Sequence, residues 1–141
     1  MELEIARKMG DGALQKARAL NLKPMSVFIQ DARGAIRLVL TEDGASQQRA
    51  EIAYGKSNGA IAFGMGTRGL AKRVGMVPEF MSTVVHAIRG PLVPVAGGVL
   101  VKDKDGTVIG AIGISGDTAD HDEACAVSGI EAVGLVAQIG D

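Results

Sequence analysis

Two strand-like runs that meet at a tight acidic turn, followed directly by a helix start, restrict the fold of this chain more than any other feature. The turn is Asp103-Lys104-Asp105-Gly106, and the whole unit occupies residues 90–126. The second run leads through Ser-Gly-Asp-Thr into an acidic segment in which Asp120 and Glu123 have capping-box spacing. Because a tight hairpin joins antiparallel strands, this unit predicts an antiparallel sheet with a helix packed on it.

The first half of the chain alternates between helical and extended patterns. Apolar residues three and four apart predict a helix over residues 2–20. Two extended runs, 25–30 and 35–40, flank a turn that ends at Gly34, and glycine there allows the positive φ of a short hairpin. Helical spacing returns between 43 and 64. One face of that helix is mostly small and consists of Ala50, Ala53, Tyr54, Ser57, Ala60 and Ile61.

The second half begins with a basic segment that Gly64, Gly66, Gly69 and Gly75 interrupt, so we expect it to be irregular. Pro78 then opens a short helix, because proline at the first helical position loses no hydrogen bond. Strands are expected over 92–95, 97–103 and 107–114, and a last helix over 120–138. The order α-β-β-α-(α)-β-β-β-α predicts one α+β domain over residues 1–141, with an antiparallel rather than a doubly wound parallel sheet.

Composition favours close packing and excludes several classes of protein. Apolar residues make up 47% of the chain, yet it has no Trp, 3% aromatic residues and 20 Gly, so small and β-branched side chains must supply the core. A net charge of -1 favours neither nucleic acid nor an anionic membrane surface. No run reaches the ~20 apolar residues of a membrane span. The acidic, polar N-terminus is unlike a signal peptide, so we expect a cytoplasmic protein.

Cys125 is the single cysteine of the chain, which excludes an intramolecular disulfide and a paired-cysteine metal site. It falls on the predicted last helix among apolar residues. We therefore expect a buried, unreactive thiol.

The strand, glycine and helix segment resembles the signature of the GlcG/HbpS family, whose members are described as haem-degrading or haem-binding. The resemblance lies in Gly97-Gly98-Val99, in Gly110 to Thr118 and in Asp122 to Ala126. The same segment resembles the C-terminal domain of PduO-type corrinoid adenosyltransferases. The resemblance implies a profilin-like fold, in which helices pack on five antiparallel strands. It also implies ring-like homo-oligomers, often octamers.

The segment from residue 115 to 121 is the first part of a predicted small-molecule site. It leads from a strand end into a helix N-terminus, where free backbone N–H groups attract an anion such as a ligand carboxylate or propionate. The candidate residues are Ser115, Gly116, Asp117, Thr118 and His121. In the alternative interpretation, Asp117, Thr118 and Asp120 themselves cap these N–H groups. A metal ion held by the acidic residues is a weaker alternative, because consecutive helical positions point in different directions.

His86 and Arg89 form the second part of the predicted site. His86 lies on a polar helix face, and Arg89 precedes a Gly-Pro bend, where its guanidinium can pair with a ligand carboxylate. We place the ligand where residues 115–121 approach this segment, close to a subunit boundary. Gly110 and Gly113 leave space for it, with close helix packing as the alternative explanation, favoured for Gly110.

The family resemblance implies haem or a related tetrapyrrole as the ligand. Haem ligation in the family is attributed to a histidine nearer the N-terminus, and this chain has no histidine before His86. The candidate haem-iron ligands are His86 and His121. Other side chains that can take that role are Tyr54, Met65 and Met81.

Two other functions stand as alternatives to tetrapyrrole binding. The first is a small enzyme or accessory protein acting on a carboxylated metabolite, as the glycolate-operon and diol-utilisation settings of the relatives imply. The second is a structural oligomer without chemistry of its own. The sequence has no Ser-His-Asp order, HExxH or paired-cysteine motif, so it predicts no catalytic residues. Gly64, Gly66 and Gly69 have dinucleotide-binding spacing but follow a helix rather than a strand, so we expect them to end that helix.

The predicted last helix indicates self-association. From Ala124 to Ala137 only Ser128 and Glu131 interrupt apolar or glycine positions. A helix that is apolar nearly all round is buried on two sides, and in a chain this small only one side can be its own sheet. We therefore expect a homo-oligomer, in agreement with the octamers of the family.

Overall fold

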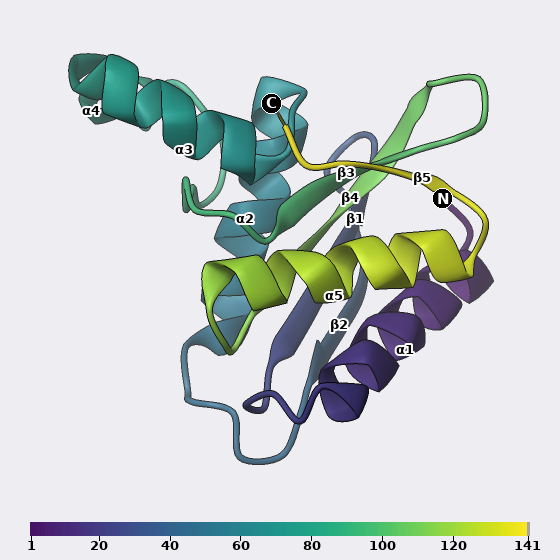
Figure 1. Ribbon diagram of the computed structural model, residues 1–141. Helices are drawn as coiled ribbons and strands as arrows, with labels where there is room; N and C mark the ends of the chain where they lie inside the picture. Colours follow the sequence, from purple (N-terminus) through teal and green to yellow (C-terminus); the bar gives the residue numbers. More distant parts are fainter. Residues whose placement is uncertain (141) are drawn as a thin grey trace.

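A five-stranded antiparallel sheet forms the middle layer of the protein, with helices on both faces (Figure 1). The computed structural model describes residues 1–140. The strands are β1 (Ser26–Asp31), β2 (Ile36–Thr41), β3 (Gly98–Lys102), β4 (Val108–Ser115) and β5 (Val136–Gln138). They lie in the order β2-β1-β4-β3-β5, and each neighbouring pair is antiparallel. The predicted fold class is confirmed.

Helices cover the two faces of the sheet unequally. Both α1 (Leu3–Ala19) and α5 (Ala119–Ala132) cover one face, and α2 (Arg49–Phe63) covers the other. The alternation of side chains along each strand explains the two layers. In β1, Ile29 belongs to the core under α1 and α5, whereas the next residue, Gln30, accepts a hydrogen bond from Ser57 of α2.

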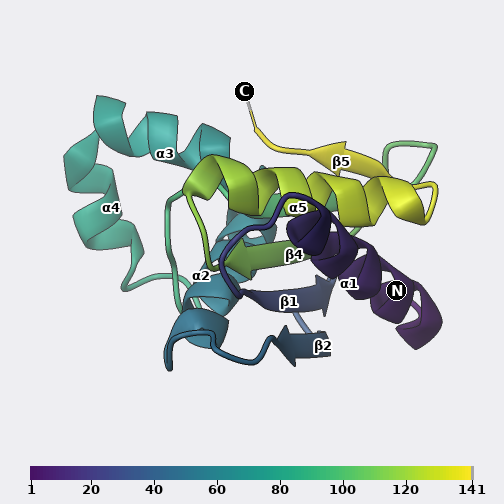
Figure 2. The ribbon, with the colours of Figure 1, turned by 60° about the horizontal axis from the view of Figure 1, so that its bottom comes forward.

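Two further helices, α3 (Thr67–Met76) and α4 (Pro78–Val84), extend away from the sheet as an arm (Figures 1 and 2). Helix α3 packs against α2 and β3, while α4 packs against α3. No residue of α4 is buried. Phe80 of α4 meets Phe63, the last residue of α2, edge-on with ring centroids 6.1 Å apart. The arm is thus attached mainly at its base.

The fifth strand of the sheet is not the one that the sequence predicted. Residues 92–95 form no strand, because the Val93 N–H donates to a carbonyl of α2 instead of to a neighbouring strand. The last helix ends at Ala132, six residues before its predicted end, and Gly134 turns the chain with φ 73°. The residues that follow form β5, which pairs with β3.

The other corrections concern α3 and the last helix. Residues 67–76, expected to be irregular, form α3, although Gly64 ends α2 as predicted, with φ 64°. Helix α1 packs along α5. The premise that a partner subunit must cover the second side of the last helix is therefore wrong. No helix within residues 1–140 has the length and apolar character needed to cross a bilayer.

Glycines let α2 lie directly on the sheet. A Cβ on Gly113 would overlap the carbonyl oxygen of Ala53, and one on Gly98 would overlap that of Lys56. A Cβ on Gly110 would overlap the backbone of the neighbouring strand. The prediction that Gly110 and Gly113 leave space for a ligand is wrong, because protein backbone fills that space.

Candidate functional site

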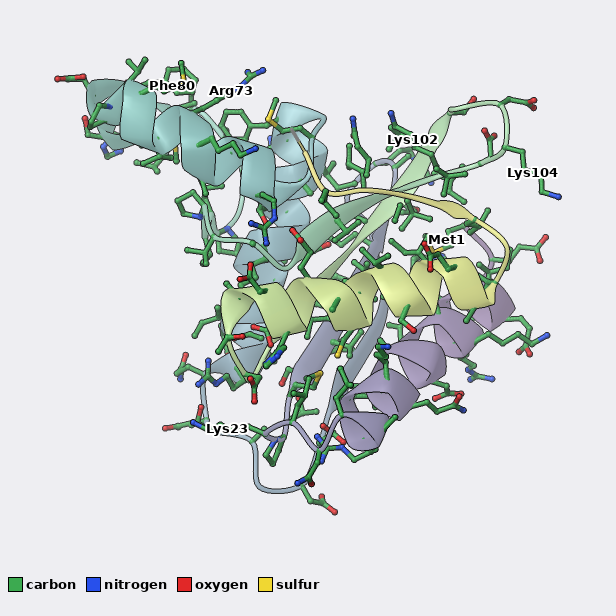
Figure 3. The ribbon with its side chains drawn as sticks, in the orientation of Figure 1. Met1, Lys23, Arg73, Phe80, Lys102 and Lys104 are labelled. Carbon is green, nitrogen blue, oxygen red and sulfur yellow. The ribbon has the colours of Figure 1, made fainter. Side chains whose placement is uncertain are left out.

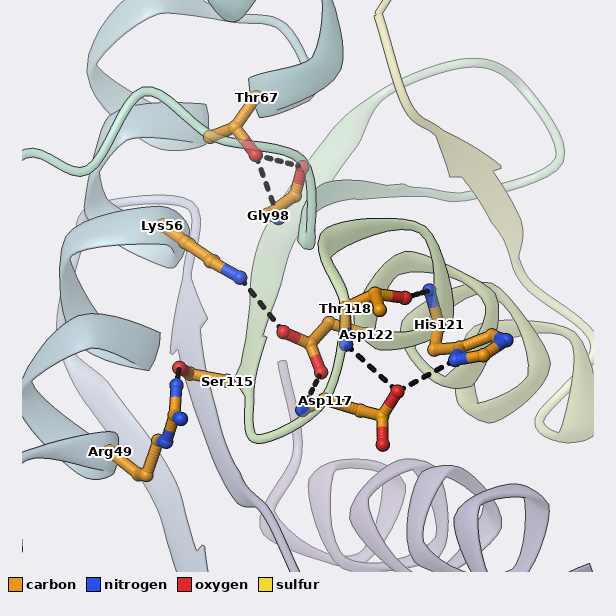
Figure 4. Close-up of polar contacts among 9 residues, drawn as sticks. All are labelled: Arg49, Lys56, Thr67, Gly98, Ser115, Asp117, Thr118, His121 and Asp122. Carbon is orange, nitrogen blue, oxygen red and sulfur yellow. Dashed lines mark hydrogen bonds and ion pairs between the residues drawn. The ribbon is translucent and has the colours of Figure 1, made fainter. Parts of the chain in front are cut away.

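The end of β4, predicted to begin an anion site, is filled by contacts within the chain (Figure 4). Ser115 is buried, and its hydroxyl oxygen accepts a hydrogen bond from the Arg49 guanidinium of α2 at 3.2 Å. Gly116 lies so close to Met25 and Pro24 that a side chain would overlap their backbone. These first two candidate residues therefore face the protein interior rather than a cleft.

The next two candidates, Asp117 and Thr118, bind groups of their own chain. The Asp117 carboxylate accepts the Lys23 and Thr118 N–H groups at 2.9 Å, and its Oδ1 lies 2.7 Å from Nδ1 of His121. These contacts, the Lys23 N–H first, hold the pKa of Asp117 well below its usual value. Thr118 Oγ1 accepts the His121 N–H at 3.2 Å and caps α5. Capping, the alternative to anion binding, is what Thr118 does.

Asp120 and Glu123 pair with Arg68 of α3 rather than with the backbone of their own helix. Arg68 Nε lies 2.9 Å from Glu123 Oε1, and an Nη atom contacts Asp120. These pairs, the Asp120 contact first, raise the pKa of Arg68. The predicted capping box is wrong, because Thr118 and not Asp120 is the N-cap of α5. The Arg68 pairs instead tie the start of α5 to the base of the arm.

A buried ion pair that sequence reasoning missed joins α2 to the start of α5. Lys56 Nζ is 3.1 Å from Asp122 Oδ2, and the two side chains are 4% and 2% exposed. Burial lowers the pKa of Lys56, and the Asp122 carboxylate offsets part of that effect. The second Asp122 oxygen accepts the Asp117 N–H at 2.9 Å. The sequence feature that could have indicated this pair is the position of Lys56 between Gly55 and Ser57, beside the face of small residues on α2.

The segment where β4 leads into α5, residues 115–123, is called the β4–α5 junction below. His86 and Arg89 lie away from this junction. Both are exposed, and the Arg89 carbonyl accepts a hydrogen bond from the Asn58 amide of α2 at 2.7 Å. Asn58 and Arg49, the partner of Ser115, are nine positions apart on α2. At 1.5 Å per residue, the two parts of the predicted site contact this helix at positions about 13.5 Å apart along its axis. The structure does not join them through a shared contact, and ligand binding by these residues stays a prediction.

His121 has the geometry of an oriented imidazole. Asp117 engages its Nδ1, which leaves Nε2 as the nitrogen for an outside ligand. Metal-binding histidines in proteins are commonly oriented in this way by a carboxylate. Within residues 1–140, however, no group of three or more His, Cys, Asp or Glu side chains is arranged to hold a metal ion. The acidic residues at the start of α5 bind protein groups instead.

The arm carries an apolar hollow of a different character. It has a volume of about 250 Å³ and is lined by Arg73, Met76, Val77 and Phe80. Figure 3 labels Arg73 and Phe80, which both lie on the arm. We call this site the arm hollow. Sequence reasoning missed it, because its residues fall in the segment where glycines obscure the helical period.

The thiol of Cys125 plays no part in either region. It is buried in α5 beneath the core of the α1–α5 face, as predicted. Burial raises its pKa to about 11, and the Asp122 carboxylate adds to that shift. A thiol of this kind is protonated and unreactive at neutral pH.

Comparison with known proteins assigns the family. The family model described as haem degrading protein HbpS-like matches residues 1–131. The chain belongs to this family. The resemblance seen in the glycine-rich strand and the helix start is thereby confirmed. No curated protein matches the sequence.

Solved structures share the fold over nearly the whole chain. The crystal structure of a PduOC–haem complex is 26% identical, with a TM-score of 0.84 and 96% of each chain covered. The structure of HbpS is 30% identical, with a TM-score of 0.80, and the match covers 93% of this chain and 88% of that one. The protein ORFY of Klebsiella pneumoniae, 22% identical with a TM-score of 0.81, shares the fold over 95% and 90% of the two chains.

Proposed function

We propose that this protein binds haem or a related tetrapyrrole. The observation that carries the proposal is the match over 96% of both chains to a relative crystallised with haem. The family description as haem degrading supports it further. Because the match covers nearly the whole of both chains, this protein shares its helices and strands with a relative that binds haem, which supports the proposal.

The side chains of this protein are chemically suited to haem. Haem binding draws on apolar surface for the macrocycle, cations for the propionates and a nitrogen, sulfur or phenolic oxygen ligand for the iron. The arm hollow offers apolar side chains, the Met76 thioether and the Arg73 guanidinium. Separately, on α5, His121 offers an imidazole oriented by Asp117. Bound haem would supply one-electron and oxygen chemistry, while the residues of the chain hold it and exclude water.

Titration with ferric haem, followed by the Soret absorbance, tests the proposal. We expect a saturable Soret shift with the wild-type protein. His86→Ala and His121→Ala test the two predicted iron ligands, and each variant is the control for the other. A shift that persists in both variants removes both histidines as ligands. The absence of any Soret change in the wild-type protein contradicts the proposal and favours the alternative of a carboxylated metabolite.

We also propose that the protein is a homo-oligomer. With α5 covered by α1, the support now comes from the edge of the sheet. Ile36 and Val39 on the edge strand β2 are exposed, and an unpaired apolar edge readily pairs with another chain. Light scattering should report a mass several times the 14.5 kDa of the chain. A stable monomer at micromolar concentration contradicts this proposal.

A further inference from the structure

We propose that the arm hollow is the tetrapyrrole-binding site of this protein. In this assignment Val77 and Phe80 contact the macrocycle, Arg73 pairs with a propionate, and the Met76 thioether is the iron ligand. The inference rests on the proposed function and adds the place and the residues. Neither histidine is required.

The arm exposes a cluster of large apolar side chains. Met76, Val77 and Phe80 are 78%, 53% and 45% exposed, and all three line one hollow. Soluble proteins seldom leave large apolar side chains clustered in water unless the cluster binds something. Phe80 is also braced edge-on by Phe63. One wall of the hollow is therefore already formed before any ligand arrives.

The arm hollow also contains a positive charge, the guanidinium of Arg73. Arg73 has no ion-pair partner among residues 1–140, whereas Arg18, Lys56 and Arg68 each pair with a carboxylate. A guanidinium without a carboxylate partner, set beside apolar walls, suits a ligand with a flat apolar body and carboxylate groups. Arg73 and Met76 are three residues apart on α3 and so share a helix face. Figure 3 shows Arg73 and Phe80 together on the arm.

Other hollows of the surface differ from the arm hollow in charge. Four other hollows each have at least one carboxylate in their lining, whereas the lining of the arm hollow has none. The larger hollow along α5, about 400 Å³, contains Asp120, Glu123 and Glu131. Its cations are Arg68, which is already paired, and Lys16, which three carboxylates accompany in the lining. Carboxylates repel the propionates of haem, so these sites fit the ligand less well.

Parallel titrations with ferric haem and with metal-free protoporphyrin separate the proposed roles. Phe80→Ala should weaken the binding of both by about tenfold, because the aromatic wall is lost. Arg73→Gln should weaken both by about threefold, as expected for a partly exposed charge pair. Met76→Leu keeps the apolar volume but removes the sulfur. It should shift the Soret maximum of the haem complex and leave protoporphyrin affinity unchanged.

Matched controls and three outcomes make the test decisive. Val136→Ala removes an exposed apolar side chain on β5 and Lys104→Gln an exposed cation in the β3–β4 turn, and neither should change affinity. Circular dichroism of each variant confirms folding.

If the wild type binds haem and all three arm variants match its affinity, the proposed site is wrong while the proposed function stands. If the wild type binds neither compound, both proposals fail. If Phe80→Ala lowers the mass of an oligomer without changing haem affinity, the hollow is a contact between copies and the assignment is overturned.

Discussion

The β4–α5 junction and the α3–α4 arm use their side chains in opposite ways. At the junction, Asp117, Asp122 and Arg68 all bond to groups of the same chain, largely out of water. On the arm, Arg73 has no carboxylate partner and the apolar side chains around it are exposed. A junction whose polar groups are already bonded stabilises the fold but offers little to a ligand. An arm with unused groups adds little stability and is the better place to look for binding.

The largest effect at the junction is expected from Asp122→Ala. This variant leaves the Lys56 ammonium buried without its partner, and breaking a buried pair costs about 3–5 kcal/mol. The free energy of unfolding from urea titration measures the loss. Replacing both residues, with Lys56→Met and Asp122→Leu, should recover much of it. A cost below about 1 kcal/mol for Asp122→Ala would show that the pair does not hold the junction.

The same substitution should have opposite signs in the two regions. Gly113→Ala places a Cβ against the Ala53 carbonyl and forces α2 off the sheet, and such overpacking costs about 1–3 kcal/mol. In α3, a Cβ on Gly75 meets nothing within 4 Å. Gly75→Ala should therefore add about 0.5–1 kcal/mol through helix propensity. Urea midpoints that fall in both variants would contradict the contrast.

Loss of a hydroxyl should also matter at the junction and not on the arm. Thr118→Ala removes the N-cap of α5, at an expected cost of about 1 kcal/mol in unfolding free energy. Ser82 of α4 donates to its own helix at an exposed position, so Ser82→Ala should change stability by less than about 0.5 kcal/mol. Equal effects in thermal unfolding would remove this difference between the regions.

The smallest effect should appear only as a dependence on pH. Because the pKa of Asp117 is lowered on folding, its carboxylate stabilises the protein above the unfolded pKa. That contribution is lost as pH falls through the lower, folded pKa. The gap in urea midpoint between wild type and Asp117→Asn should hold from pH 7 to about pH 5 and narrow below about pH 4. A gap that does not change down to the acid limit would show that the lowered pKa does not stabilise the fold.

The sequence predicted those parts of the fold that local signals determine. The turns at Gly34 and at 103–106 are short and glycine-bearing, so both hairpins formed as expected. The sequence missed β5, because three residues carry no period of their own and this strand exists through its pairing with β3. The sequence missed α3 because Gly69 and Gly75 interrupt its helical pattern. This helix is stabilised by its contacts with α2 and β3.

The site was harder to predict than the fold for a chemical reason. Ser and Thr before a helix suit both an anion site and a cap, and the nearby Asp residues favour the cap. Only the contacts of Thr118 and Asp117 show that these side chains bind N–H groups of their own chain. Lys56 lies among small residues of α2 that indicate close packing, so the sequence did not predict an ion pair there. Arg73 and Phe80 belong to different helices and meet only through the bend between them.

The buried thiol of Cys125 can report when the layer formed by α1 and α5 opens. A thiol-labelling reagent can react with it only when this layer opens, because burial both blocks access and raises the pKa of the thiol to about 11. With a single cysteine in the chain, the labelling rate under native conditions counts openings of this layer and is silent to motions of the arm. The same shielding keeps the thiol out of reach of oxidants in the surrounding solution.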